Sequence, residues 1–347
     1  MGPRFAARHW YRLSAVSLLL IPFSLVFSLL VRLRRSFYRL GILPSIRLRV
    51  PVIVIGNRTV GGTGKTPLVL WLAAELRRQG RRPAILCRGY GAAETGPRAV
   101  LGGDDAGRVG DEPLLLVARS QCPVWVGRDR AATGNALLRA HPDCDVIVCD
   151  DGLQHYRLQR DIEIAVEDER GHGNGLLLPA GPLREPADRP VDALVRNCEP
   201  AARAADASAS ESRMAAHGGG TAPHVFQMQL EPSGFHLVCD PARTVAPGEL
   251  AGKRLHAVAG IGNPQRFFAL LARLGLDPVC HAFPDHHAYR TTDLEFADCD
   301  WVLMTEKDAV KCARFDRGDL VALRVDAVLD PAFADFLTRT LHGRAPA

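Results

Sequence analysis

The chain has 347 residues, of which 47% are hydrophobic and 23% charged, a composition typical of a soluble globular protein with room for two domains. The formal net charge is +5, but nine of the 43 basic residues are arginines within residues 1–50, where no acidic residue occurs. The remaining 34 basic and 38 acidic residues give the rest of the chain a net charge of −4, so we expect no general nucleic-acid-binding surface.

Nine cysteines are scattered along the chain, and none belongs to a Cys-x-x-Cys pair. This spacing favours reduced thiols over disulfides or a zinc site. We therefore expect the bulk of the chain to lie in the cytoplasm.

Residues 13–31 form an uncharged, almost wholly apolar segment. As a helix it would be roughly 28 Å long, which is just enough to cross a bilayer. A cleaved signal peptide is disfavoured because a run of arginines begins at Arg32, in the place of a cleavage site. Arginines flank both ends and Pro22 can kink the helix, so we expect residues 1–40 to anchor in the membrane interface rather than to span the bilayer. Spanning the bilayer and a buried core helix are the alternatives.

A glycine-rich sequence, Gly-Gly-Thr-Gly-Lys-Thr at residues 61–66, follows an apolar run at residues 50–55 and precedes a helix-like segment at 67–78. Strand, glycine-rich turn, Lys-Thr and helix is the order of a phosphate-binding loop (P-loop), whose backbone N–H groups hold phosphate oxygens. Lys65 can reach the β- and γ-phosphates, and the Thr66 hydroxyl can ligate Mg²⁺. The strict pattern has glycine six residues before the lysine, where this chain has threonine. The predicted ATP-binding residues are Thr59, Val60, Gly61, Gly62, Thr63, Gly64, Lys65 and Thr66.

Apolar runs and helical segments then alternate, which predicts an α/β fold with a parallel sheet and helices on both faces. The run at residues 145–149 leads into the adjacent carboxylates Asp150 and Asp151, the form of a Walker B element. A carboxylate at the end of a buried strand beside a P-loop can hold a metal ion or its water, and adjacent strand residues point to opposite faces. Solvated strand-end acids are the alternative interpretation.

The composition changes beyond residue 200. Residues 201–220 are rich in Ala, Ser and Gly, which predicts a flexible linker or surface excursion. The linker would separate a P-loop domain at residues 41–200 from a smaller α/β domain at residues 221–347. This second domain contains Phe-Pro-Asp-His-His at residues 283–287, for which a metal site, an acid–base pair and plain loop polarity are all open interpretations.

An ordered set of motifs behind a basic, apolar N-terminus resembles the tetraacyldisaccharide 4'-kinase family, the lipid A pathway kinases. In addition to the P-loop, the motifs are Arg-Gly-Tyr-Gly at 88–91, Gly-Asp-Glu-Pro at 110–113, Asp-Asp-Gly-Leu-Gln-His at 150–155, the Pro- and Gly-rich segment 178–186, Phe-Pro-Asp-His-His at 283–287 and Thr-Glu-Lys-Asp at 305–308. The resemblance implies phosphoryl transfer from ATP to the 4'-hydroxyl of a tetraacylated glucosamine disaccharide 1-phosphate. It also implies a P-loop NTPase-like domain with the membrane helix, a hinge and a smaller C-terminal domain.

The resemblance further implies site residues. Asp111 would pair with His286, or with His287 as the alternative, and act as base toward the sugar hydroxyl once the domains close. Lys65 and Mg²⁺ would stabilise charge on the transferring phosphoryl group. The predicted metal ligands are Thr66, Asp150, Asp151 and Glu185. The predicted contacts to the acceptor are Arg88, Tyr90, Arg130 and His155, with a plain surface position for Arg130 as the alternative.

These predictions place a monomeric enzyme at the cytoplasmic face of the inner membrane, anchored by its N-terminal helix, because the acyl chains of the substrate stay in the bilayer. The alternative function is a membrane-associated P-loop ATPase or GTPase regulator without a lipid-sugar acceptor. Val60 argues against the cell-division type of ATPase, which carries a signature lysine at that position. The lysine of Thr-Glu-Lys-Asp lies one place too late for a guanine-binding motif. A non-enzymatic nucleotide sensor would tolerate the loss of Asp111.

Overall fold

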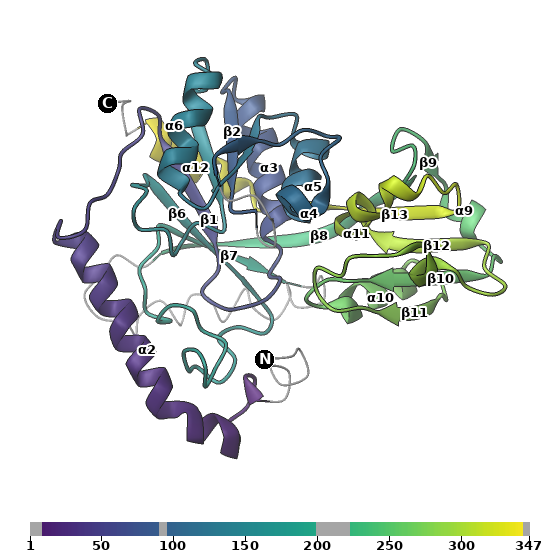
Figure 1. Cartoon of the computed structure of the whole chain (residues 1–347), viewed down its shortest axis with the longest axis horizontal. Coiled ribbons are helices and arrows are strands. Elements are labelled where there is room, and N and C mark those ends of the chain that lie inside the picture. The colour runs from purple at the N-terminus through teal and green to yellow at the C-terminus, as the bar shows by residue number, and fades with distance from the viewer. Residues whose placement is uncertain (1–8, 90–95, 199–222, 343–347) are drawn as a thin grey trace.

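The computed structural model describes residues 9–89, 96–198 and 223–342, so the predicted linker at 201–220 and Tyr90 lie outside the described residues. The described strands belong to one 13-stranded mixed sheet (Figure 1). They are β1 Val52–Gly56, β2 Pro83–Cys87, β3 Arg98–Ala99, β4 Val124–Val126, β5 Val146–Asp150, β6 Ile162–Asp168, β7 Ala193–Asn197, β8 His224–Leu237, β9 Thr244–Val245, β10 Leu255–Ala259, β11 Val279–Ala282, β12 Trp301–Thr305 and β13 Leu320–Leu329. The order across the sheet is β11-β10-β12-β13-β8-β7-β6-β1-β5-β2-β4-β3, with β9 paired to β8.

The strands of the P-loop half are parallel except for the two-residue edge strand β3, which pairs antiparallel with β4, and every residue of β1, β2 and β5 is buried. Strands covered on both faces are continuously apolar, which is why these runs stand out in the sequence. Side chains alternate along β1, so that Ile53 and Ile55 face the core under α3 (Lys65–Arg78) and α5 (Asp111–Ser120). Val52 and Val54 face the opposite core, under α6 (Arg130–Ala140). The expected α/β fold with helices on both faces is confirmed.

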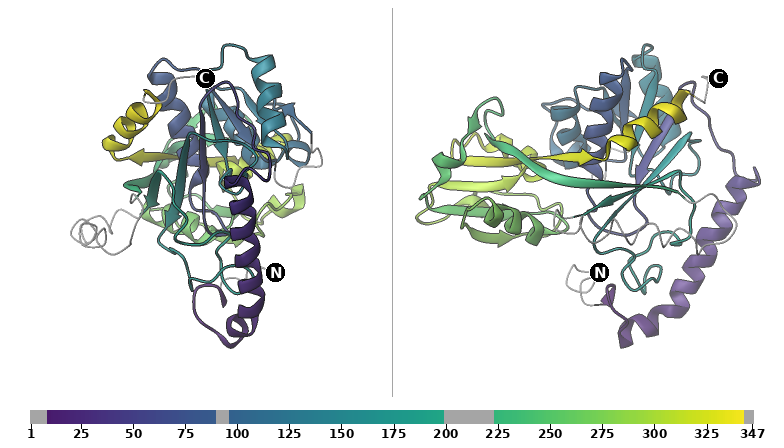
Figure 2. Two further views of the ribbon diagram at one scale, coloured as in Figure 1. Left: turned by 90° about the vertical axis from the view of Figure 1, so that its left-hand side faces the viewer. Right: turned by 180° about the vertical axis from the view of Figure 1, so that it is seen from behind.

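The sheet continues into a second lobe beyond residue 223. β8 begins parallel to β7 and then, from Met228 to Leu237, runs antiparallel to β13, so these two long strands join the lobes (Figure 2). Phe267 and Leu271 of α10 pack on the core of the second lobe, between the sheet and solvent. The helices of this lobe are α9 Pro247–Leu250, α10 Pro264–Arg273 and α11 Glu306–Cys312, with 3₁₀ turns at Thr291–Leu294 and Ala313–Phe315. The short α4 (Ala106–Val109) precedes α5 in the P-loop half.

The last helix, α12 (Pro331–His342), returns to the P-loop half. Phe333 and Phe336 pack against Phe226, and the ring centroids of Phe333 and Trp71 lie 5.5 Å apart, which places α12 beside α3. From the sequence, residues 331–342 are expected in the C-terminal domain. The difference arises because an amphipathic helix shows which face is buried but not which neighbour covers that face.

The N-terminal helix α2 (Ala15–Arg39) lies along the outside of the P-loop half (Figures 1 and 2). Its buried residues are Ser17 and Ser24, and Ser24 Oγ donates a hydrogen bond to Leu177 O at 2.8 Å. Its exposed apolar side chains are Leu18, Leu19, Phe23, Leu25, Val26, Leu29, Leu30, Leu33 and Phe37. Within the described residues, α2 is the helix that is long and apolar enough to cross a membrane, judged by length and composition. The alternative of a buried core helix is therefore excluded.

Candidate active site

The P-loop connects β1 to α3, and two of its glycines adopt conformations that other residues avoid. Gly61 has a φ of +113° and Gly64 a φ of +93°, and a Cβ on Gly64 would lie 2.5 Å from the Asn197 side-chain nitrogen. Lys65 begins α3, and its Nζ lies 3.5 Å from Asp151 Oδ1. The loop therefore has the geometry of a phosphate cradle, with its lysine beside the strand-end carboxylate.

Threonine at position 59 has a structural reason. Thr59 forms an antiparallel bridge with Leu183, and the Val60 N–H donates to Pro182 O at 2.9 Å. Among the described residues, Thr59 is not one of those with a positive φ. A position in an extended β-bridge does not require the conformational freedom of glycine. The departure from the strict pattern marks the place where the P-loop pairs with the 178–186 segment.

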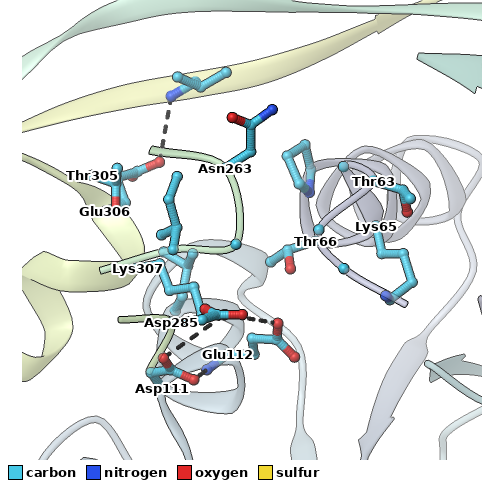
Figure 3. Close-up of a pocket in the computed structure, with 18 of the residues that line it drawn as sticks. Thr63, Lys65, Thr66, Asp111, Glu112, Asn263, Asp285, Thr305, Glu306 and Lys307 are labelled. Atoms are coloured by element: carbon cyan, nitrogen blue, oxygen red, sulfur yellow. Dashed lines mark hydrogen bonds and ion pairs between the residues drawn. The ribbon is translucent and has the colours of Figure 1, made fainter. Parts of the chain in front are cut away.

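A cleft of about 750 Å³ opens between the P-loop and the second lobe (Figure 3). The P-loop and the end of β5 form one wall, and the 261–263 turn, α10 and residues 305–307 form the other. Asp111 and Glu112, from the first turn of α5, also line the cleft. β1 and β5 both end at this point because the carboxyl ends of neighbouring parallel strands lie at one edge of the sheet.

The two carboxylates at the end of β5 have opposite environments. Asp150 is 3% exposed, and its burial, followed by the charge of Glu112, raises its pKa to about 7. Asp151 has a φ of +47° and accepts hydrogen bonds from Arg184 at 3.1 and 2.9 Å. Burial opposes ionisation of Asp151, but the charges of Lys65 and Arg184 hold its pKa well below the usual range. Asp151 is therefore the permanently charged member of the pair.

The oxygens at this edge of the cleft suit a magnesium ion. Asp150 Oδ1 is buried without a hydrogen-bond partner among the described residues, and Thr66 and Asp151 line the same cleft. Mg²⁺ is usually held by one or two carboxylates together with substrate phosphates, not by a full set of side chains. The part of the chain that the structure describes has no group of three or more His, Cys, Asp or Glu side chains placed to hold a metal.

The structure brings Asp111 and His286 together across the cleft. His286 Nδ1 lies 3.1 and 3.0 Å from the two carboxylate oxygens of Asp111. Burial opposes ionisation of Asp111, but the hydrogen bond to His286 and the charge of Lys307 lower its pKa. The same hydrogen bond raises the pKa of His286. His287 lies 3.0 Å from Asp293 instead, so the geometry selects His286 as the partner of Asp111.

Lys307 is a site residue that the sequence analysis did not assign. Its Nζ lies 3.9 Å from Asp111, 3.2 Å from Glu112 and 3.6 Å from Asp285, so three carboxylates share one ammonium (Figure 3). Burial opposes the charge, but Glu112, Asp111 and Asp285 together raise the pKa of Lys307 above its usual range. The Thr-Glu-Lys-Asp motif was visible, but its spacing gives no link to Glu112, which lies 195 positions earlier.

Asn57 and Arg184 were also missed. Asn57 is fully buried directly after β1, and its Oδ1 accepts a hydrogen bond from Lys65 Nζ at 3.2 Å. Arg184 donates to the Asn57 backbone oxygen at 3.2 Å and also to its side-chain oxygen, in addition to its two bonds to Asp151. The two residues thus orient Lys65 and Asp151 toward each other. A polar residue directly after a buried strand was the available signal for Asn57.

The structure places two of the predicted contacts, Glu185 and Arg130, away from the lining of the cleft. Glu185 is 1% exposed, its carboxylate oxygens accept hydrogen bonds from the Tyr156 hydroxyl at 2.6 and 2.7 Å, and Arg189 Nε lies 3.4 Å away. Glu185 is thus absent from the lining of the cleft, and its predicted role as a metal ligand does not fit this geometry. Arg130 is also 1% exposed, and its guanidinium donates to backbone oxygens, including Asp150 O at 2.8 Å. Arg130 supports the end of β5, and it lies neither in the lining of the cleft nor on the surface.

The remaining predicted acceptor contacts differ in position. His155 Nε2 accepts the backbone N–H of Arg130 at 3.3 Å, and burial followed by the Arg130 charge lowers its pKa to about 4. His155 is therefore a neutral imidazole behind the cleft wall. Arg88 is exposed and lines the same cleft as Asp111. Tyr90 lies outside the described residues.

A P-loop with a strand-end aspartate pair, faced by an Asp–His pair across one cleft, defines a P-loop phosphotransferase. A model of the tetraacyldisaccharide-1-P 4'-kinase family matches residues 16–342. The chain belongs to this family, and the resemblance inferred from its motifs is confirmed.

Relatives from several bacteria support this membership. The tetraacyldisaccharide 4'-kinase of Azoarcus sp. strain BH72 is 49% identical, over 99% of this chain and 97% of its own length. The tetraacyldisaccharide 4'-kinase of Coxiella burnetii strain Dugway 5J108-111 is 41% identical, over 97% of this chain and 95% of its own. The crystal structure of the "apo" form of LpxK from Aquifex aeolicus in complex with ATP is similar with a TM-score of 0.76 and 28% identity, covering 94% of this chain and 99% of that one.

Proposed function

We propose that this chain phosphorylates the 4'-hydroxyl of a tetraacylated glucosamine disaccharide 1-phosphate with ATP, a step of lipid A biosynthesis. The observation that carries the proposal is the Asp111–His286 pair, which lines the same cleft as Lys65 of the P-loop. A P-loop alone would bind a nucleotide without indicating an acceptor. Membership of the family supports the acceptor, and the ATP complex of the related Aquifex protein supports the donor.

Asp111 is the base of the proposed reaction. It is ionised because His286 and Lys307 keep its pKa low. The acceptor hydroxyl oxygen bonds to the γ-phosphorus, the bond from the γ-phosphorus to the β–γ bridging oxygen breaks, and ADP leaves while the hydroxyl proton passes to Asp111. Phosphoryl transfer has a loose transition state, so a weak base in the right position suffices. His286 keeps the carboxylate oriented toward the hydroxyl.

The P-loop and its neighbours act on the donor. Backbone N–H groups of the loop hold the phosphates, and Lys65 places positive charge beside the transferring phosphoryl group. Thr66, Asp150 and Asp151 would hold Mg²⁺, which neutralises phosphate charge when bound. Asp150 suits this role because burial raises its pKa to about 7, so that a nearby cation completes its ionisation.

We place the enzyme at the cytoplasmic face of the inner membrane, as a monomer with α2 as its anchor. The outward face of α2 is apolar, and a cluster of arginines from Arg32 to Arg39 suits anionic headgroups at its C-terminal end. Residues 41–200 would bind the donor, residues 221–347 would complete the site with His286, and Arg88 would contact the acceptor. The acyl chains can then stay in the bilayer while the sugar enters the cleft.

The test is transfer of radiolabelled phosphate from ATP to the tetraacyl disaccharide 1-phosphate in detergent micelles, followed by thin-layer chromatography. Asp111→Asn keeps the shape of the side chain, so turnover should fall by about 10²- to 10⁴-fold while ATP affinity stays near that of wild type. Asp335→Asn, at an exposed acid on α12, is the matched control. Absence of transfer by wild type, with ATP hydrolysis retained, would favour the regulatory ATPase.

A further inference from the structure

Three consecutive carbonyl oxygens of the P-loop are each held by a side chain from outside the loop. The pairs are Asn57 Nδ2 with Gly61 O at 3.0 Å, Arg170 Nη2 with Gly62 O at 2.6 Å, and Asn197 Nδ2 with Thr63 O at 3.0 Å. In a planar trans peptide the C=O of one residue and the N–H of the next point in opposite directions. Holding these oxygens on the outside therefore turns the N–H groups of residues 62–64 inward, where phosphate oxygens bind.

Arg170 differs from the other two donors in what else it contacts. Asn57 and Asn197 lie at the ends of strands beside the loop, whereas Arg170 lies in the turn after β6. Asp168 fixes its guanidinium through hydrogen bonds at 2.9 and 2.6 Å. Arg170 Nη1 then lies 3.3 Å from the Tyr11 hydroxyl, and its Cζ lies 6.0 Å from the centre of the Tyr11 ring. One guanidinium thus joins the P-loop to the segment that leads into α2.

The residues that follow Arg170 join the same two parts of the chain. We call residues 168–183 the bridge segment. The Asn174 N–H donates to Trp10 O at 2.8 Å, and Trp10 Nε1 donates to Pro179 O at 3.1 Å. At its other end the bridge segment accepts the Val60 N–H at Pro182 O. It therefore touches the residues before α2 on one side and the P-loop on the other.

We propose that Arg170 is a positioning residue for ATP binding, because it holds Gly62 in the phosphate-binding geometry. Through its contact with Tyr11, this geometry also depends on the position of the segment before α2. The reason is that a planar guanidinium can satisfy Asp168, Gly62 and Tyr11 together only in one orientation. If α2 is inserted in a bilayer, the segment at Tyr11 is held in place, so ATP binds more tightly to the membrane-bound enzyme than to the free enzyme. This last consequence rests on the proposed membrane anchoring.

The first experiment measures the ATP dissociation constant, by calorimetry in detergent, together with kcat and KM for ATP. Arg170→Met should weaken ATP binding by about tenfold, the loss expected for a hydrogen bond from a charged donor. KM for ATP should rise in parallel while kcat stays within about twofold, because the loop holds ground state and transition state alike. Arg170→Lys, which keeps charge without the fork, should weaken binding nearly as much. Arg139→Met, at an exposed arginine on α6, is the control.

Tyr11→Phe tests the second contact, and it remains informative if Arg170→Met does not fold. Loss of the hydroxyl should weaken ATP binding by about threefold, whereas Tyr38→Phe, at a tyrosine that packs on Tyr156, should not. Wild-type ATP affinity in both Arg170 variants would overturn the positioning role, and wild-type affinity in Tyr11→Phe would overturn the link to the N-terminal segment.

Vesicles of phosphatidylethanolamine and phosphatidylglycerol test the membrane consequence. Their addition should tighten ATP binding by about threefold in wild type and leave Tyr11→Phe unchanged. Flotation with the same vesicles reports anchoring separately, and phosphate transfer to the acceptor reports the proposed kinase function separately. Flotation without tighter ATP binding would overturn the coupling, and so would an absence of flotation.

Discussion

Lys307→Met removes the ammonium that Asp111, Glu112 and Asp285 share. Two unit charges about 4 Å apart at an effective dielectric constant of about 20 attract by about 4 kcal/mol, and Lys307 Nζ lies 3.9 Å from Asp111. The lysine side chain is 18% exposed, so solvent screens the interaction little. Desolvation of the ammonium offsets part of the attraction, which leaves about 2–3 kcal/mol that holds Asp111 in place.

Without the cation the three carboxylates repel one another, and Asp111 leaves its position beside His286. We expect kcat at pH 7 to fall by about 10²-fold, the factor that corresponds to about 2.7 kcal/mol. Lys307 lowers the pKa of both Asp111 and His286, so the pKa of each should rise in the variant. The acidic limb of kcat/KM against pH should therefore move to higher pH.

The assay is phosphate transfer across a range of pH with Lys307→Met, Lys307→Arg and the exposed control Lys253→Met. The carboxylates around Lys307 lie outside the P-loop, so the ATP dissociation constant should change by less than about threefold. A kcat for Lys307→Met within threefold of wild type, with an unshifted acidic limb, would refute the reasoning.

Further predictions concern the Asp–His pair, the Walker B carboxylates and the anchor. His286→Ala should lower kcat by about 10²-fold while His287→Ala stays within fivefold, and equal losses in the transfer assay would contradict the pairing. The lowered pKa of Asp111 stabilises the folded protein above pH 3.8, the ordinary pKa of an aspartate, and this stabilisation is lost as the pH falls through the pKa of the folded state. The raised pKa of His286 stabilises the folded protein below pH 6.5, the ordinary pKa of a histidine, and this stabilisation is lost as the pH rises through the pKa of the folded state. The difference in melting temperature between wild type and His286→Ala should therefore be greatest between pH 3.8 and 6.5, and a difference that grows toward pH 9 would be inconsistent with it. Arg184→Met removes a cation from Asp151, so the pKa of Asp151 should rise and kcat/KM for ATP should fall by about tenfold, measured against the Arg139→Met control. Leu19→Asp, on the exposed face of α2, should reduce flotation with vesicles without changing ATP affinity in detergent, and unchanged flotation would argue against anchoring by this face.

The sequence predicted the P-loop half of the fold well because its strands are buried on both faces. The apolar run at 50–55 became β1 almost unchanged. β8 continues to Leu237 through Pro232 and Gly234, which are residue types that usually mark a turn. The strand survives there because β13 pairs with it through a shift of register between Arg324 and Val325. Pairing with β13 therefore outweighs the local turn preference of Pro232 and Gly234.

The residues of the candidate site also differ in whether local sequence or tertiary contacts determine their positions. Lys65, Thr66 and the Asp150–Asp151 pair follow from local spacing, because strand, turn and helix fix their positions within a few residues. Glu185 lies in the 178–186 segment and Arg130 begins α6, but the sequence does not show which way a side chain points, and both face the protein interior. Lys307 depends on contacts between the two lobes, which no local pattern encodes.

The two long strands that join the lobes also govern how the cleft can change its width. β8 and β13 form a ribbon that is held at the P-loop end by pairing of β8 with β7 and by α12, which follows β13 and packs beside α3, and at the other end by pairing of β13 with β12. Between these two attachments the pairing of β8 and β13 shifts register at Arg324, and such an irregularity increases the local twist of a strand pair. Opening of the cleft therefore requires this ribbon to bend or twist, and α12, although remote from the chemistry, helps to fix the end of the ribbon at the P-loop half.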